Sequence, residues 1–162
     1  ELELQLNKQL ESLNSFSFPS TELPIVHAII DFKSKSAKES SAKIECSTRI
    51  LAKSTINDID LAILLGNLLD NAIEATAVLP DHSKKEIRVF VEVTEPQMIV
   101  SVTNPVIKDI NVNHLKTTKN DSQNHGYGLL AVRRIADKYN GTLLLDCQNN
   151  TLGASAVLNQ PE

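Results

Sequence analysis

Two short stretches of this chain carry residue types that could act together on a phosphate. Residues 67–75 (Asn-Leu-Leu-Asp-Asn-Ala-Ile-Glu-Ala) place carboxamides and carboxylates along one segment, and residues 125–129 (His-Gly-Tyr-Gly-Leu) form a glycine-rich turn. Amide and carboxylate oxygens suit Mg²⁺, which takes few protein ligands and leaves its other positions to phosphates and water. Glycines let the backbone approach a phosphate, and unpaired N–H groups at a helix start point at it. Together the two stretches predict a magnesium–nucleotide site.

The first stretch lies within a helix that we expect from residue 57 or 58 to about residue 79, before Pro80. At about 100° per residue, its polar side chains fall within an arc of about 100°, and leucines occupy the opposite side. An ordinary solvated face would explain this pattern. However, the helix has no basic residue, and asparagine is a poor helix former. A functional polar face is therefore the alternative, made of Asp60, Asn67, Asp70, Asn71 and Glu74.

The second stretch holds two of the five glycines of the chain, Gly126 and Gly128, just before a helix expected over residues 129–139. A Gly-x-Gly pair alone is weak evidence, because glycine is common in turns of every kind. The polar residues beside it could contact phosphates, or they could be solvated loop residues and a local cap. These neighbours are Thr117, Thr118, Lys119 and His125.

The hydrophobic periodicity predicts an α+β fold with helices on one face of a mixed, mostly antiparallel sheet. Besides the two helices above, we expect a helix over 24–39 and a polar loop over 106–123. Strands are expected over 42–52, 86–95, 98–102, 142–147 and 154–158, with a turn at Asn149-Asn150.

Residues 1–22 are expected to form a helical segment and a linker, separate from a domain over 23–162. Leucines at positions 2, 6, 10 and 13 make one helical stripe. This stripe either docks on its own domain or ends a longer dimerising helical segment that begins upstream of Glu1.

The composition excludes some classes of protein. The net charge of −4 argues against a nucleic-acid binder, which needs clustered positive charge. No apolar run approaches the roughly 20 residues of a membrane span. Cys46 and Cys147 form no metal-binding or redox motif, and we expect both to pack in the core of a protein in a reducing compartment.

The two stretches resemble conserved boxes of sensor histidine kinases. Residues 67–75 look like the N box, residues 125–129 look like the second glycine box, and Thr117-Thr118-Lys119 is similar to the Ser-Thr-Lys element of the ATP lid. The resemblance covers about residues 23–160. It implies the Bergerat fold, a two-layer α/β sandwich shared with DNA gyrase, MutL and a heat-shock chaperone, and it implies ATP and Mg²⁺ as cofactors.

The resemblance also implies roles for single residues. Asn71 would bind Mg²⁺ through its side-chain oxygen. Asn67 takes the position of a catalytic Glu in the hydrolysing ATPases of the superfamily, and an amide is no general base, so phosphotransfer is favoured over hydrolysis. Lys119 would act in catalysis. The residues expected to contact the nucleotide phosphates are Thr118, His125, Gly126, Tyr127, Gly128 and Leu129.

One motif departs from the family pattern. Where most of these kinases have Asp-x-Gly-x-Gly, residues 102–106 are Val-Thr-Asn-Pro-Val, so Asn104 would have to accept the hydrogen bond from adenine. This departure and the wording of the N box resemble the Agr-type kinases that sense peptide pheromones. A degenerate nucleotide-binding module that regulates a partner by contact is the alternative, and a superfamily ATPase or an anti-sigma-type serine kinase is a further one.

The family resemblance predicts the partners and the location as well. The phosphorylated His would lie on dimerising helices upstream of this chain, in a homodimeric protein that passes the phosphate on to a response regulator. The domain would face the cytoplasm as part of a membrane-bound bacterial sensor kinase.

Overall fold

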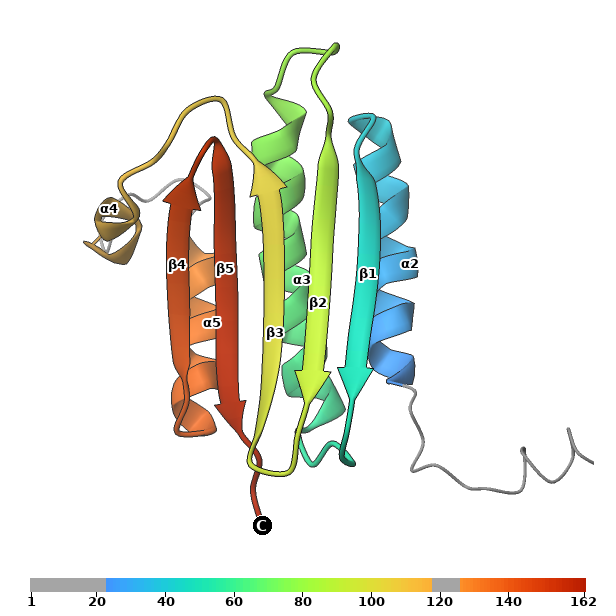
Figure 1. Ribbon diagram of the computed structural model, residues 1–162, viewed down its shortest axis with the longest axis vertical. Coiled ribbons are helices and arrows are strands. Elements are labelled where there is room, and N and C mark those ends of the chain that lie inside the picture. The colour runs from blue at the N-terminus through green and yellow to red at the C-terminus, as the bar shows by residue number, and fades with distance from the viewer. Residues whose placement is uncertain (1–22, 118–125) are drawn as a thin grey trace, which may run out of the picture.

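A computed structural model describes residues 23–117 and 126–162 as a five-stranded sheet with helices packed on one of its faces (Figure 1). The expected segment 1–22 lies outside the described residues. The helices are α2 (Pro24–Glu39), α3 (Asp58–Ala77), α4 (Val112–Thr117) and α5 (Gly126–Lys138). The strands are β1 (Lys43–Ile50), β2 (Glu86–Val93), β3 (Gln97–Pro105), β4 (Thr142–Gln148) and β5 (Thr151–Asn159).

The sheet has the order β1-β2-β3-β5-β4 and is mixed, as expected. Strand β1 pairs with β2 in parallel, and the three other pairings are antiparallel. Helix α3 connects the two parallel strands, and it lies behind the middle of the sheet between α2 and α5 (Figure 1). The element that carries the N box is therefore the central helix of the second layer.

The core lies between α3 and the helix-facing side chains of the central strands. Alternation along β2 and β3 buries every second side chain, from Ile87 to Val93 and from Met98 to Asn104. Five leucines of α3 face them and are at most 2% exposed, and each contributes about 1.5–3 kcal/mol by burial. They are Leu61, Leu64, Leu65, Leu68 and Leu69. The apolar side of α3 is thus held against the sheet, and its polar side must point elsewhere.

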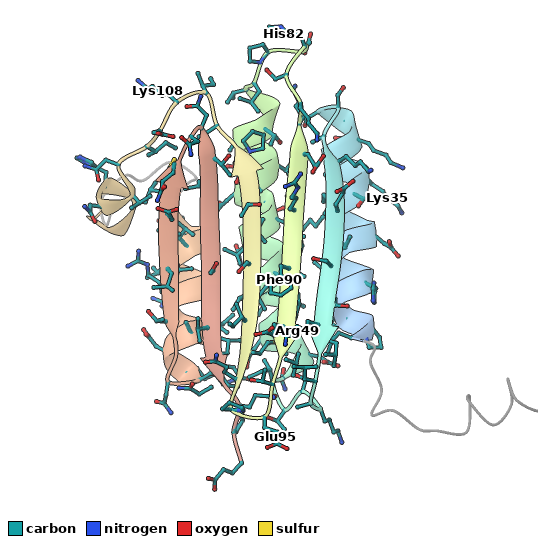
Figure 2. The ribbon with its side chains drawn as sticks, in the orientation of Figure 1. Lys35, Arg49, His82, Phe90, Glu95 and Lys108 are labelled. Atoms are coloured by element: carbon teal, nitrogen blue, oxygen red, sulfur yellow. The ribbon has the colours of Figure 1, made fainter. Side chains whose placement is uncertain are left out.

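Among the described residues, no helix covers the other face of the sheet. Phe90 lies over this face near its middle and is 38% exposed (Figure 2). The hydroxyls of Ser101 and Ser155, on neighbouring strands, lie 2.7 Å apart on the same face. The predicted site residues Asn67, Asn71 and Asn104 lie instead in the helical layer and at a strand end.

Three element boundaries differ from the sequence predictions, among them the start of β5, which lies at Thr151 rather than at residue 154. Helix α5 begins at Gly126 rather than at residue 129, so the two glycines belong to its first turn instead of a preceding loop. Strand β3 continues to Pro105 rather than ending at residue 102. Proline fits there because the pairing of β3 with β2 ends at Thr103, whereas the pairing with β5 continues to Thr151.

Two turns follow the predictions closely. Asn149 and Asn150 both have positive φ angles, 51° and 57°, as a tight hairpin between β4 and β5 requires. Asn140 ends α5 with φ at 49°, and Gly141 follows it. A Cβ on Gly141 would lie 1.8 Å from the carbonyl oxygen of Val157, so glycine is needed there for close approach rather than for its φ angle.

The prediction that both cysteines lie in the core is wrong for Cys46, which is exposed on the edge strand β1, whereas Cys147 is partly buried. Neither forms a disulfide. Within residues 23–117 and 126–162, no helix combines the length and the apolar character that crossing a membrane requires.

Candidate nucleotide site

Helix α3 presents Asn67 and Asn71 on the side that faces α5. Its first turn is fixed by Asn57, whose side-chain oxygen accepts hydrogen bonds from the amide nitrogens of Ile59 and Asp60 at 2.8 and 3.4 Å. The side-chain nitrogen Nδ2 of Asn67 donates a hydrogen bond to the backbone carbonyl oxygen of Ile63 at 2.7 Å. This bond uses the donor end of the Asn67 carboxamide, so its oxygen is the end directed away from the helix backbone.

Gly128 in the first turn of α5 lies directly against these two asparagines. A Cβ on Gly128 would lie 3.2 Å from Asn67 Oδ1 and 3.4 Å from Asn71 Oδ1. No described glycine has a positive φ angle, so Gly128 is needed for space and not for its backbone conformation. The two predicted stretches therefore converge, and amide oxygens of α3 meet the amino end of α5.

The amino end of α5 is suited to bind an anion. The first N–H groups of a helix have no intrahelical partner, and the helix dipole favours negative charge there. Because Gly128 has no side chain, a phosphate can approach the backbone beside Asn67 and Asn71. The seam between α3 and α5 thus offers oxygen ligands on one side and N–H donors on the other.

Asn104, the residue expected to recognise adenine, lies near the end of β3. It is 5% exposed, and it follows Met98, Val100 and Val102 on the face of the strand that packs under the helices. Its side-chain nitrogen Nδ2 donates a hydrogen bond to the backbone carbonyl oxygen of Pro105 at 3.0 Å. The carboxamide oxygen is thereby the end available to accept a hydrogen bond, as the expected contact with an adenine amino group requires.

The other predicted site residues are only partly described. Thr118, Lys119 and His125 lie outside the described residues, so their roles stay predictions. The side chain of Tyr127 is 70% exposed and that of Leu129 packs against the core. Both residues can therefore contribute to an enclosed phosphate site only through their backbone.

The acidic residues of α3 do not form one shared site, contrary to the simplest interpretation of the polar face. Asp70 turns to the other side of the helix and forms an ion pair with Lys33 of α2 at 2.6 Å. Asp60 is bound to residues at the far end of α5. The positive charge missing from α3 is thus supplied by its two neighbouring helices.

The described side chains fit a magnesium ion held mainly by its nucleotide. Asn67 and Asn71 supply hard amide oxygens at the seam, and a Cβ at position 128 would fill the space beside them. Residues 23–117 and 126–162 contain no group of three or more His, Cys, Asp or Glu side chains that would make a protein-only metal site. Mg²⁺ commonly binds through one or two protein ligands together with phosphates, which agrees with this arrangement.

Asp60 and Tyr139 form a hydrogen bond between α3 and the residue after α5, at the end of the seam opposite to Gly128. The Tyr139 hydroxyl donates to Asp60 Oδ2 at 2.6 Å and accepts from the amide nitrogen of Asn57 at 3.1 Å, and Lys138 Nζ donates to Asp60 Oδ2 at 2.7 Å. Hydrogen bonds from Lys138 and Tyr139 lower the pKa of Asp60 below its ordinary value of 3.8. Burial and the nearby carboxylate raise the pKa of Tyr139 above 10.0.

Sequence reasoning placed Asp60 on the polar face but missed its partner. Asp60 and Asn71 are 11 residues apart, and so are Gly128 and Tyr139. Eleven residues make about three helical turns, so each pair lies on one face of its helix. The equal spacing of Asp60 from Asn71 and of Gly128 from Tyr139 was the signal in the sequence that could have indicated the contact between Asp60 and Tyr139.

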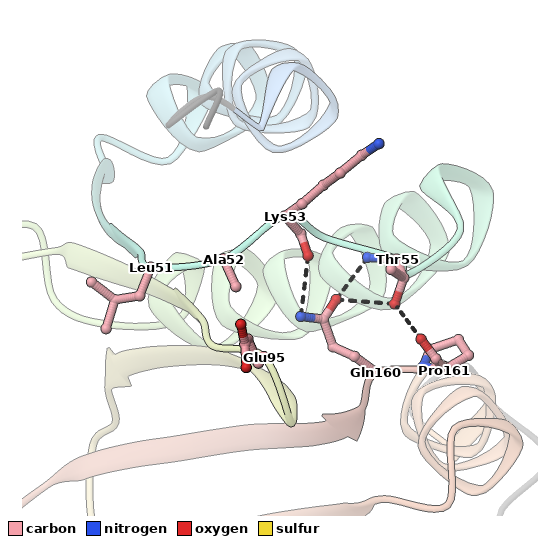
Figure 3. A pocket seen from close by; sticks show the side chains of 7 residues that line it. All are labelled: Leu51, Ala52, Lys53, Thr55, Glu95, Gln160 and Pro161. Atoms are coloured by element: carbon pink, nitrogen blue, oxygen red, sulfur yellow. Dashed lines mark hydrogen bonds between the residues drawn. The ribbon is translucent and has the colours of Figure 1, made fainter. Parts of the chain in front are cut away.

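A pocket of about 420 Å³ lies at the opposite end of β3 from Asn104, beside the β2–β3 turn (Figure 3). Its lining includes Lys53, Thr55 and Glu95. The Gln160 side chain spans it, because its oxygen accepts from the Thr55 amide nitrogen at 2.7 Å and its nitrogen donates to the Lys53 carbonyl oxygen at 3.3 Å. These bonds fasten Gln160, which follows β5, to the segment between β1 and α3.

Comparisons with known proteins agree with this geometry. The model of the GHKL domain family matches residues 56–158. The catalytic domain of the histidine kinase ThkA has a similar structure, with a TM-score of 0.65 and 17% identity over 84% of this chain and 90% of that one. The histidine kinase AdeS of Acinetobacter baumannii gives a TM-score of 0.64 and 15% identity over 85% of this chain and 64% of that one.

No curated protein matches the chain at a significant level. At 15–17% identity, the likeness to the two kinases establishes the fold and not the reaction. The predicted two-layer Bergerat fold is nevertheless confirmed. Because the family model covers well over half of the sequence, this chain belongs to the GHKL family of ATP-binding domains.

Proposed function

We propose that this domain binds Mg-ATP at the seam between α3 and α5 and transfers the γ-phosphate to a histidine of an upstream helical domain. The observation that carries the proposal is the contact of Gly128 with Asn67 and Asn71. It unites metal-binding oxygens and anion-binding N–H groups at one place. ThkA and AdeS, two proteins of similar fold, are histidine kinases, and the histidine acceptor in this proposal is taken from them.

The residues of this chain would act mainly by positioning. Asn71 Oδ1 holds the metal ion, the N–H groups of the first turn of α5 hold the phosphates, and Asn104 Oδ1 accepts a hydrogen bond from the adenine amino group. Bound Mg²⁺ supplies neutralisation of the phosphate charge. In phosphoryl transfer such positioning and charge neutralisation account for most of the catalysis.

Asn67 favours a histidine over water as the acceptor of the phosphate. Its carboxamide is no base, and its nitrogen already donates to Ile63. Water needs to lose a proton when it attacks, whereas a neutral imidazole nitrogen near pH 7 is already a competent nucleophile. The site can therefore serve a kinase without a general base of its own.

The wider setting of the domain follows from the same proposal. In this proposal the phosphoacceptor helices lie upstream, residues 1–22 join them to the domain, and the full-length protein is a homodimer that passes phosphate to a response regulator. The resemblance of residues 67–75 and 102–106 to the Agr-type kinases supports a peptide-sensing kinase, with this domain on the cytoplasmic side of a membrane-bound sensor.

A direct test is phosphate transfer from labelled ATP to a separately supplied helical domain that carries the candidate histidine. The kinase proposal expects label on the histidine, acid-labile and dependent on Mg²⁺. One observation favours the alternative, a nucleotide-binding module that acts by contact: residues 104–106 are Asn-Pro-Val where the family pattern has Asp-x-Gly, so the glycine is absent. Tight ADP binding without transfer to any histidine would support that alternative.

A further inference from the structure

We propose that Tyr139 and Asp60 are positioning residues that hold α5 against α3 and thereby keep Gly128 beside Asn67 and Asn71. The effect on nucleotide binding rests on the proposed site, but the placement of α5 does not. We call the hydrogen-bonded group of Asn57, Asp60, Lys138 and Tyr139 the seam clamp. It lies at the end of the α3–α5 seam that is remote from the nucleotide.

Helices α3 and α5 run antiparallel and meet at two places. Asp60 near the start of α3 meets Tyr139, the residue after the end of α5, and Asn71 further along α3 meets Gly128 near the start of α5. Both pairs of positions are 11 residues apart, which spans about 16 Å along a helix. A shift or rotation of α5 at one meeting place is therefore transmitted to the other.

The contact at the nucleotide end cannot hold itself in place. Gly128 has no side chain, and its neighbours Asn67 and Asn71 meet only its backbone. Val132 and Ala136 anchor α5 to the core by close apolar packing. Hydrogen bonds at the other end of the seam add directional constraints on the rotation and the axial position of the helix.

Tyr139 supplies such bonds, and its own backbone is held by the sheet. Its backbone carbonyl accepts from the amide nitrogen of Asn159 at the end of β5 at 3.1 Å. Its hydroxyl donates to Asp60 and accepts from the amide nitrogen of Asn57, the capping residue of α3. Tyr139 is 8% exposed, so these bonds are shielded from water. The residue therefore links the sheet, the end of α5 and the start of α3.

The test compares Tyr139→Phe, which keeps the ring but removes the hydroxyl, with Asp60→Asn and with the double variant. Ser155→Ala is the matched control, because it removes a partly buried hydroxyl that bridges two elements on the opposite face of the sheet. Two quantities are measured under conditions in which each protein is folded: the dissociation constant for Mg-ADP, and the NMR signals of the side-chain amide groups of Asn67 and Asn71.

We expect each clamp variant to weaken Mg-ADP binding by about threefold to tenfold, the size of typical long-range coupling. The double variant should lose less than the sum of the two single variants, because Asp60→Asn weakens the same Tyr139–Asp60 bond that Tyr139→Phe removes. The amide signals of Asn67 and Asn71 should shift in both clamp variants, although neither changed atom touches them, and should stay in place in Ser155→Ala.

Unchanged amide signals in folded Tyr139→Phe and Asp60→Asn would overturn the inference, and so would equal Mg-ADP affinity in wild type and both variants. If wild-type protein bound no adenine nucleotide, the proposed function would fail instead. The amide signals would then still decide whether the seam clamp positions α5.

Discussion

Gly128 and Asn67 touch across the seam between two helices that lie about sixty residues apart in the sequence. A methyl group on the glycine would lie 3.2 Å from the carboxamide oxygen, closer than ordinary van der Waals contact. The glycine therefore marks a place where backbone must approach a functional side chain. Position 128 is the most sensitive test of the proposed site.

Gly128→Ala should weaken Mg-ADP binding by about tenfold or more while leaving the fold intact. The new methyl group displaces Asn67 or Asn71, whereas alanine in a helix contributes about 1 kcal/mol of stability relative to glycine. Isothermal titration gives the affinity, and urea unfolding gives the stability. Gly66→Ala in α3 is the control, since its Cβ would meet only Lys33 Cε at 3.9 Å. It should raise stability and leave the affinity unchanged.

Asn71→Ala should reduce the dependence of nucleotide affinity on Mg²⁺. The variant loses one of the two amide oxygens that would ligate the metal, but it keeps Asn67 and the N–H groups of α5 that would hold the phosphates. We expect Mg²⁺ to strengthen ADP binding less than in the wild type, and phosphotransfer to fall below detection. Transfer at the wild-type rate at ordinary Mg²⁺ concentrations would contradict the role given to Asn71.

Asn104→Asp, which restores the acid of the family pattern, should destabilise the nucleotide-free domain. The Asn104 nitrogen donates to the Pro105 carbonyl, and a buried carboxylate would face that oxygen without a proton to share. An unpaired buried group of this kind costs about 1–3 kcal/mol or more. The substituted acid has a raised pKa, so the loss should shrink as the pH falls and the acid becomes protonated. Urea unfolding at pH 7 and pH 5 measures both effects.

The stabilising effect of Asp60 should be lost in the acid range. Because Lys138 and Tyr139 lower the pKa of Asp60 in the folded protein, its contribution is fully present above the ordinary value of 3.8 and is lost as the pH falls through the lowered pKa. Wild type should exceed Asp60→Asn in thermal stability at pH 7. The difference should narrow below about pH 4. A difference that stays constant down to pH 2 would contradict the assigned ionisation.

The spacing of hydrophobic residues predicted most of the fold, because that spacing depends on which side chains are buried. The alternation along residues 87–93 and the leucine stripe of α3 both depend on which side chains face the core, and both elements lie where expected. The start of α5 was missed because Gly126 and Gly128 are weak helix formers. Tertiary contact with α3 overrides their local preference, and local sequence carries no record of that contact.

The site was predicted only in part. Asn67, Asn71 and Gly128 are neighbours in space, as the two stretches indicated, because chemistry restricts their residue types. The ionic contacts were beyond prediction, since Asp70 bonds to Lys33 and Asp60 to Lys138, residues 37 and 78 positions away. Which of several acids on a helix meets which base depends on the packing of neighbouring helices.

The position of the seam between α3 and α5 has a consequence for folding. In the proposed site each helix supplies only part of the contacts to the nucleotide, and the two parts meet only when α3 and α5 are both docked on the sheet. A nucleotide that binds solely the assembled pair stabilises the whole domain by mass action, by about 2.7 kcal/mol at a hundredfold excess over its dissociation constant. The melting temperature of this domain would thus report cellular ATP or ADP.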